Sequence, residues 1–187
     1  MKVSQDGKCL VNVMFSNSLI MCDFDNSTGI ISNPKRISST IGNGPGMVTN
    51  TYGLAFSPCD LLIYVTNLFP PSIYRFERFA ANINASETIF NLSGSPQALQ
   101  LGPDGKIYMI SMTNDNFLSI INQPNIAGKG CDFQDMAIDL QGKRGSYGLP
   151  TFIAGFDYNE ENFNKVPKDN SIKFEIYPNP FQLYGVL

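Results

Sequence analysis

A short phrase that recurs three times restricts the fold of this chain more than any other feature. The copies read VSQDGKCLVNV at 3–13, FSPCDLLIYV at 56–65 and LGPDGKIYMI at 101–110. When the copies are aligned, the repeated units begin at residues 4, 57 and 102, which gives spacings of 53 and 45 residues. Repeats of about 40–50 residues are typical of the blades of β-propellers.

Each copy of the phrase predicts a β-hairpin. Asp-Gly supplies the positive φ angles that a tight two-residue turn requires, and apolar or β-branched residues flank it. The second copy has Asp60-Leu61 in place of Asp-Gly, so we expect a different turn there. The residues that we assign to these turns, and to no chemistry, are Asp6, Gly7, Asp60, Asp104 and Gly105.

The segments that follow the hairpins also resemble one another. Polar and apolar residues alternate in MCDFD at 21–25 and in YRFE at 74–77. Period-two alternation is typical of a strand with one buried and one wetter face. Clusters of Gly, Ser, Asn and Pro separate the units, and no stretch has a sustained 3.6-residue apolar period. The sequence therefore predicts an all-β chain with four short strands in each unit.

We expect these units to be about three four-stranded antiparallel blades of a partial β-propeller over residues 1–156, with a further partial set of strands in 131–155. A β-sandwich is the alternative, because strands punctuated by turns also suit that fold. Closed propellers have about four to eight blades. Three blades cannot close a ring, so we predict an open fragment whose first and last sheets expose their edges.

Charge and composition exclude several classes of function. The chain of 187 residues has 13 Lys and Arg against 16 Asp and Glu, a formal net charge of −3, and no Lys/Arg cluster larger than a pair. Nucleic acid is therefore a poor candidate partner. His is absent, which excludes Ser/His/Asp triads, Cys/His pairs and His-based zinc sites. We find no cofactor motif and no nucleophile arrangement, and predict a protein that is not an enzyme.

The sequence shows neither a signal peptide nor a membrane span. MKVSQDGKCLVNVMF enters a strand-like pattern at once, without the apolar segment and cleavage site of a signal peptide. No apolar run approaches 18 residues. Either the protein is cytoplasmic or its true beginning is missing.

The four cysteines, Cys9, Cys22, Cys59 and Cys131, include no CxxC pair and no metal-type spacing. An even number permits three disulfide pairings in an oxidising compartment. We favour Cys9 and Cys22 as small apolar residues in strands, and leave the pairing open.

Two further sets of residues are candidates for binding. Amide and carboxylate oxygens at loop ends can hold Ca²⁺ in a propeller channel, although Asn and Asp are also the usual residues of turns. These oxygens belong to Asn17, Asn50, Asn67, Asn114, Asp115 and Asn116. Aromatic side chains near strand ends can bind a protein or a glycan, although we favour packing between blades. They are Phe69, Phe79, Phe117 and Phe133.

Several stretches resemble a known family. YGLAFSPCDLLIYVTN, GSPQALQLGPDGKIYMI, INQPNIAGKGCDF and GLPTFI resemble the last blades of seven-bladed WD40-like or YVTN-like propellers. These propellers belong to large secreted and surface proteins of bacteria with a type IX secretion system. SIKFEIYPNPF at 171–181 is similar to the opening of a type A C-terminal sorting domain, which continues well beyond Leu187 in the family.

The resemblance implies an organisation and a location. Residues 1–156 would be propeller blades, the polar stretch 157–170 a linker, and 171–187 the start of a truncated sorting domain. A secreted or cell-surface location follows, with the secretion machinery as a partner if the sorting domain is complete.

For function we expect a non-catalytic binding or scaffold module with an unknown protein or glycan ligand. One alternative is a Ca²⁺-dependent lactonase or esterase of propeller shape. Another is an intracellular propeller scaffold.

Overall fold

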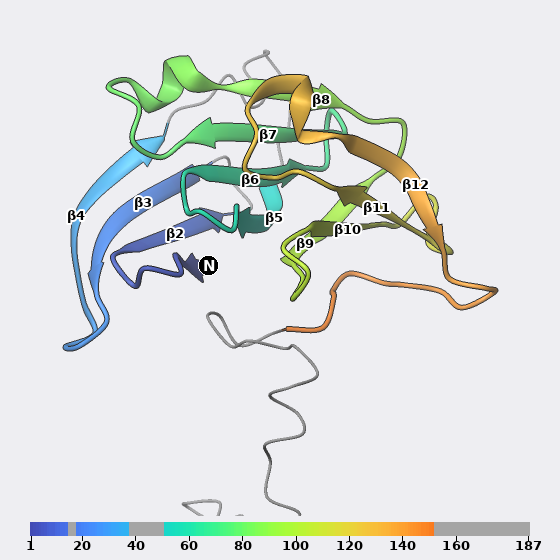
Figure 1. The fold of residues 1–187 in the computed structure, drawn as a ribbon, viewed down its shortest axis with the longest axis horizontal. Coiled ribbons are helices and arrows are strands. Elements are labelled where there is room, and N and C mark those ends of the chain that lie inside the picture. Colours follow the sequence, from blue (N-terminus) through green and yellow to red (C-terminus); the bar gives the residue numbers. More distant parts are fainter. Residues whose placement is uncertain (15–17, 38–50, 152–187) are drawn as a thin grey trace, which may run out of the picture. The chain divides into compact units, whose positions relative to one another are not determined.

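The structure is a computed structural model that describes residues 1–14, 18–37 and 51–151. These residues form three four-stranded antiparallel sheets and two short 3-10 helices (Figure 1). The all-β partial propeller that the repeats predict is confirmed. The predicted linker at 157–170 and sorting segment at 171–187 lie outside the described residues. Within the described part, no helix is long and apolar enough to cross a membrane.

Each sheet takes its strands in chain order, and we call each sheet a blade. Blade 1 contains β1 (Lys2–Val3), β2 (Cys9–Met14), β3 (Ser18–Asp25) and β4 (Ile30–Ile37). Blade 2 contains β5 (Thr51–Phe56), β6 (Leu62–Asn67), β7 (Ser72–Glu77) and β8 (Thr88–Asn91). Blade 3 contains β9 (Pro96–Leu101), β10 (Ile107–Ser111), β11 (Phe117–Ile121) and β12 (Phe133–Asp139). The further partial set of strands predicted in 131–155 is not found in residues 131–151, because β12 is the last strand of blade 3 and residues 140–151 form no strand.

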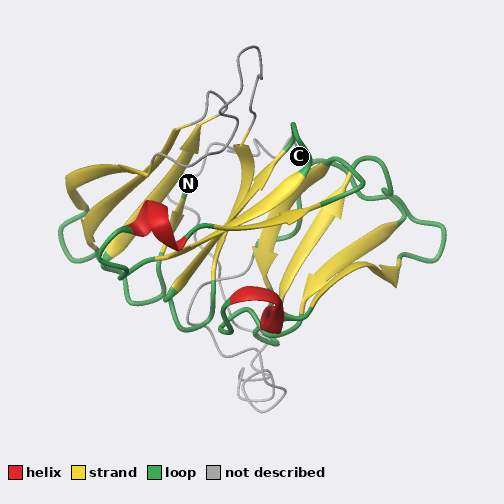
Figure 2. Ribbon diagram, turned by 90° about the horizontal axis from the view of Figure 1, so that it is seen from above, coloured by secondary structure: helices red, strands yellow, loops and turns green. Residues whose placement is uncertain are grey.

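The two 3-10 helices lie in the loops between the third and fourth strands, η1 (Ile83–Ser86) in blade 2 and η2 (Gly128–Cys131) in blade 3 (Figure 2). The first strands lie where the blades approach one another, since β5 contacts both β9 and β2. We therefore call β1, β5 and β9 the inner strands.

Strand register relates the blades residue by residue. The last residue of each inner strand pairs with the second strand just beyond the turn, as Val3 with Leu10, Phe56 with Ile63 and Leu101 with Ile107. Counting from these pairs, Tyr64 of blade 2 is equivalent to Tyr108 of blade 3. In the same way, Thr66 is equivalent to Ile110.

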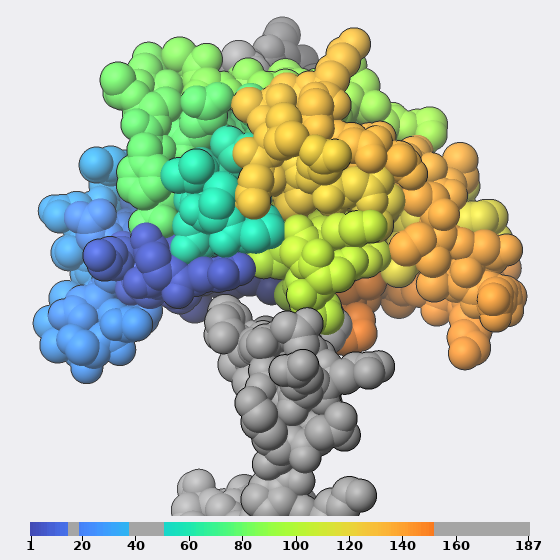
Figure 3. Space-filling model, in the orientation of Figure 1, coloured from blue at the N-terminus to red at the C-terminus, as the bar shows by residue number. Residues whose placement is uncertain are grey.

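Blade 2 lies between the other two blades, as Figure 3 shows. Its two faces contribute to two different apolar clusters. The first cluster joins blades 1 and 2 through Cys9, Val11, Leu19, Ile37, Leu54, Phe56, Ile63, Val65, Tyr74 and Phe76. The second joins blades 2 and 3 through Ala55, Leu62, Tyr64, Ile73, Leu99, Ile107, Met109, Ile121 and Cys131. Fully buried side chains as large as Tyr64 and Phe76 stabilise the fold by about 1.5–3 kcal/mol each.

The burial of β7 differs from the sequence prediction. Alternation in 74–77 predicts one buried and one wetter face, yet both faces of the strand are buried as far as Arg75 and Phe76. The physical reason is the neighbouring sheet on each side. Arg75, at 3% exposure, points into the space between blades 2 and 3. In a sheet with a neighbour on one side only, a side chain on the other face would meet water.

Candidate functional site

The turn between the first and second strands has the same backbone in all three blades. The N–H groups of Gly7, Asp60 and Gly105 donate to the carbonyl three residues earlier, at 3.0, 2.9 and 3.1 Å. These residues have positive φ angles of 67°, 58° and 76°. The arrangement is a β-turn that ends in a left-handed residue, which is the usual connection of three- and four-residue hairpin loops.

Two predictions about these turns are therefore wrong. The sequence predicts two-residue turns with positive φ at both Asp and Gly, but only the last residue of each turn is left-handed. It also predicts a different turn at Asp60, where glycine is missing. Asp60 adopts the same conformation as Gly7 and Gly105, because Asp tolerates the left-handed region better than most residues.

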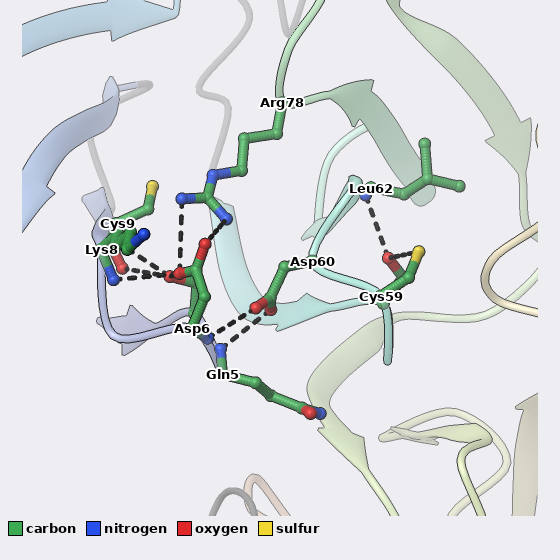
Figure 4. A network of polar contacts seen from close by, with 10 residues as sticks. Gln5, Asp6, Lys8, Cys9, Cys59, Asp60, Leu62 and Arg78 are labelled. Carbon is green, nitrogen blue, oxygen red and sulfur yellow. Dashed lines mark hydrogen bonds and ion pairs between the residues drawn. The ribbon is translucent and has the colours of Figure 1, made fainter.

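Hydrogen bonds to the first turn hold Asp60 in this conformation. Its two carboxylate oxygens accept from the backbone N–H groups of Gln5, at 2.9 Å, and Asp6, at 2.8 Å (Figure 4). The Asp60 side chain is buried. A left-handed Asp costs roughly 1–2 kcal/mol, and two hydrogen bonds to a carboxylate offset that cost. The residue that replaces glycine thus joins the turns of blades 1 and 2.

Asp6 joins the same two blades through a charge pair. Its carboxylate accepts from Arg78 Nη1 at 3.0 Å, from the Ser4 hydroxyl and from the Lys8 N–H (Figure 4). Burial raises the pKa of Asp6, but the hydrogen bonds from Ser4 and Lys8 and the Arg78 guanidinium outweigh this effect and lower the pKa to about 2. The Asp6 carboxylate therefore stays charged at any pH above that value.

Arg78 connects this network to exposed apolar side chains. Its guanidinium lies 4.7 Å from the ring centroid of Phe79. The backbone N–H of Arg78 donates to the backbone carbonyl of Leu61 at 2.8 Å. Arg78 is buried, whereas Phe79 is 68% exposed and Leu61 is 49% exposed. A buried, paired cation thus fixes the inner face of an aromatic ring whose outer face meets solvent.

The turn of blade 2 makes a comparable contact with blade 3. The N–H of Cys59 donates to Asn125 Oδ1 at 3.0 Å, and the buried Tyr64 hydroxyl donates to the carbonyl of Pro124 at 2.9 Å. Burial raises the pKa of Tyr64, so this hydroxyl keeps its proton. Ile126, next to Asn125, is 45% exposed. We call Leu61, Phe79 and Ile126 the turn-end surface.

The predicted oxygen ligands do not form a described site. Asn17 and Asn50 lie outside the described residues. Asn67 is buried at the end of β6, where its amide donates to the carbonyl of Pro70. Asn114, Asp115 and Asn116 lie in the corresponding loop of blade 3, with Asp115 3.7 Å from Arg144. In the described ranges, no three His, Cys, Asp or Glu side chains gather into a group that could hold a metal ion.

The four aromatic candidates have different environments. Phe133 packs against the second cluster, with its ring centroid 6.4 Å from that of Phe90, as packing between blades predicts. Phe117 is half-buried at the start of β11. The prediction of packing is wrong for Phe69 and Phe79, which are 60% and 68% exposed. Both follow strand ends in blade 2, where the neighbouring sheets no longer cover them.

All four cysteines are free thiols. Cys9 and Cys22 lie buried in strands, as the sequence predicts, and Cys131 is buried at the end of η2. Burial raises the pKa of Cys9 and of Cys131. Cys59, beside Asp60 in the second turn, is the exposed cysteine.

Arg78 and Asn125 are the site residues that sequence reasoning misses. Arg78 lies 72 residues from Asp6 and Asn125 lies 66 residues from Cys59. Only the alignment of the blades brings them together. The signal that could have found them is the repeat itself, since both follow the third strand of a blade.

Comparison with known proteins adds little to this geometry. No protein-family model and no curated protein matches the chain. A crystal structure from Bacteroides uniformis, described as a candidate 6-phosphogluconolactonase, is similar with a TM-score of 0.45 and 15% sequence identity. The match covers 73% of this chain and 39% of that chain. The chain therefore spans well under half of that protein.

Proposed function

We propose that this chain is a non-catalytic binding module that holds a protein partner at the turn-end surface. The observation that carries the proposal is the exposed ring of Phe79, supported from below by the buried Arg78–Asp6 pair. Aromatic anchors with a rigid support are the residues that dominate binding energies at protein interfaces. A secreted or cell-surface location is part of the proposal and rests on the family resemblance alone.

Preorganisation favours this surface over other exposed apolar residues. The chain loses less conformational entropy when it binds through a side chain that is already fixed. Phe79 is fixed by Arg78, which is itself held by Asp6 of the neighbouring blade and by the carbonyl of Leu61. Aliphatic Leu61 and Ile126 nearby favour an apolar side chain of a protein over a glycan.

A photo-crosslinking experiment identifies the partner. The full chain is expressed in its source cells with p-benzoylphenylalanine at position 79, and cross-linked proteins are identified by mass spectrometry. The matched control carries the same group at position 69, which is similarly exposed but lies in the loop between β6 and β7. We expect a specific cross-linked protein at position 79 only.

Binding of that protein is then measured with two variants. We expect Phe79→Ser to weaken binding by about 10–30-fold, with Phe69→Ser unchanged and both variants as stable as the wild type. Equal cross-linking at both positions would contradict the proposal. So would Ca²⁺-dependent hydrolysis of lactones or esters by the full chain, abolished by a chelator, because that result supports the enzyme alternative.

A further inference from the structure

The chain turns sharply after β12 and then runs outside the three sheets (Figure 1). The N–H of Lys143 donates to the carbonyl of Leu140 at 3.1 Å. Between these two residues, Gln141 and Gly142 have positive φ angles of 53° and 78°. Positive φ at both central residues is typical of a type I′ turn. A Cβ added at Gly142 would meet no atom within 4 Å apart from its chain neighbours, so the turn projects into open space.

Two basic residues follow this turn. Lys143 and Arg144 are both exposed, and the Arg144 side chain is 79% exposed. Residues 140–151 form neither a strand nor a helix, so the peptide bonds around the basic pair take no part in a sheet. Exposed segments with small and polar residues are the preferred sites of proteolytic cleavage. Gly145 and Ser146, which follow the pair, are residues of that kind.

Few polar contacts hold residues 144–151 to the rest of the molecule. In the part of the chain that the structure describes, their hydrogen bond and their ion pair both go to Asp115. The N–H of Gly145 donates to the Asp115 carbonyl at 2.6 Å, and Arg144 Nη1 lies 3.7 Å from the Asp115 carboxylate. Gly145 also packs against the Ile110 side chain. One hydrogen bond and one exposed ion pair contribute little to stability, so the segment can detach while the sheets stay folded.

The other Lys-Arg pair of the sequence, Lys35-Arg36, has a different environment. Both residues are exposed, but they lie in β4, where Lys35 pairs with Met21 and Arg36 pairs with Ile20. A protease has to draw a strand out of its sheet before the strand can enter the active site, and here this step breaks the ladder between β3 and β4. The two pairs therefore differ in access, although they have the same residues and both face solvent.

A cut after Arg144 leaves the blades complete. All twelve described strands lie within residues 2–139. The turn-end surface of Leu61, Phe79 and Ile126 also precedes the cut. Cleavage at this point therefore separates the three blades from the remainder of the chain and breaks none of their strand pairs.

We propose that Lys143-Arg144 is a processing site, at which an endoprotease that prefers basic residues releases the blades from the chain that follows them. Such a protease holds the Arg144 guanidinium with a carboxylate in its specificity pocket. It hydrolyses the peptide bond between Arg144 and Gly145. One water is consumed, the carbonyl carbon of Arg144 becomes a carboxylate, and the nitrogen of Gly145 becomes a free amino group. The processing site goes beyond the proposed binding function and does not depend on it.

Limited digestion with an Arg-specific endoprotease tests access to this bond in the full chain. The arginines of the sequence are Arg36, Arg75, Arg78 and Arg144, of which Arg75 and Arg78 are buried. We expect the first product, identified by its intact mass, to end at Arg144, and cleavage there to be at least tenfold faster than at Arg36. The product should unfold in urea as cooperatively as the full chain. A first cut at Arg36, equal rates at the two sites, or an unfolded product would overturn the proposal.

Two double variants give a matched comparison. Lys143→Gln/Arg144→Gln should remove the early product. Lys35→Gln/Arg36→Gln changes an equally exposed basic pair and should leave the rate of the early cut unchanged. Loss of the early product in both variants, or in neither, would contradict the assignment.

Processing itself is tested in the source cells. The wild-type chain and the two double variants are expressed there, and the products that contain the blades are isolated with an antibody and weighed by mass spectrometry. We expect the wild type and Lys35→Gln/Arg36→Gln to yield a product that ends at Arg144, and Lys143→Gln/Arg144→Gln to yield none. Absence of this product from the wild type, or its presence in Lys143→Gln/Arg144→Gln, would show that the pair is not a processing site.

Discussion

Two buried arginines in blade 2 differ in how well their donors are satisfied. Arg78 has a carboxylate partner in Asp6 and packs its guanidinium against the Phe79 ring. Arg75 donates from Nη2 to the Thr88 hydroxyl at 2.7 Å and lies 3.7 Å from the Glu77 carboxylate, but its buried Nε and Nη1 have no hydrogen-bond partner among the described residues. Burying an unsatisfied polar group costs about 1–3 kcal/mol. The two residues should therefore respond differently to the same substitution.

We expect Arg75→Met to leave the free energy of unfolding unchanged or to raise it by up to about 2 kcal/mol, because a thioether of similar length removes the unsatisfied donors. Arg78→Met should lower it by about 1–3 kcal/mol, because it leaves Asp6 without its charged partner. Urea unfolding of the two variants measures both values. A loss of more than about 1 kcal/mol in Arg75→Met would show that the contacts with Thr88 and Glu77 outweigh the cost of the unsatisfied donors.

The depressed pKa of Asp6 gives the stability a definite dependence on pH. Its folded value of about 2 lies below the ordinary 3.8, so the charged group contributes stability above pH 4 that is lost as the pH falls toward 2. We expect wild type to be more stable than Asp6→Asn at pH 7, and the difference to shrink between pH 4 and pH 2. Unfolding at several pH values measures this difference in stability. When the same Asp6→Asn substitution is made in Arg78→Met protein, the difference should be smaller at every pH. A difference that grows on acidification would contradict this assignment.

At the scale of the turn, Asp60 has two separable roles. It takes a left-handed backbone at φ 58°, and its carboxylate accepts from Gln5 and Asp6. Asp60→Gly removes the carboxylate but still takes the left-handed backbone at low cost. Asp60→Ala removes the carboxylate and also takes that backbone at a higher cost. We expect losses in the free energy of unfolding of about 2 kcal/mol for Gly and about 3 kcal/mol for Ala. Equal losses in urea unfolding would mean that the left-handed backbone at position 60 adds no cost for alanine.

The hairpin phrases could be predicted from the sequence because a turn depends on neighbouring residues. Asp6-Gly7 and Asp104-Gly105 predict connections between strands wherever they occur in such a context. The turn at Asp60 could not be predicted, because the groups that favour its backbone belong to another blade. The buried second face of β7 was missed for a related reason: Arg75 is polar, and only the neighbouring sheet decides that it is covered.

For the whole molecule, the number and order of blades followed from the repeat, but the contacts between blades did not. The Asp6–Arg78 and Cys59–Asn125 contacts connect residues that are 72 and 66 positions apart. Such pairs depend on how one sheet twists against the next. The exposure of Phe79 depends on the same packing between blades. Residue type alone predicts that this aromatic side chain packs between blades, because it does not show where the neighbouring sheet ends.

The two apolar clusters of the molecule share blade 2 but not their cysteines. Cys9 belongs to the cluster of blades 1 and 2, and Cys131 to the cluster of blades 2 and 3. In the folded protein we expect one thiol, Cys59, to react rapidly with an aromatic disulfide reagent, and all four after unfolding. Rapid reaction of Cys9 or Cys131 under native conditions would show that the cluster containing that thiol is open.

Because each of these two thiols lies in a different interface between blades, its labelling rate measures the opening of that interface. The labelling rate of Cys9 reports how often blades 1 and 2 part, and that of Cys131 reports how often blades 2 and 3 part. Equal rates would mean that the array opens as one unit, and unequal rates that it opens from one end, in the manner of stacked repeats. Mass spectrometry of the native chain can therefore time both events in one sample, without any substitution in the protein.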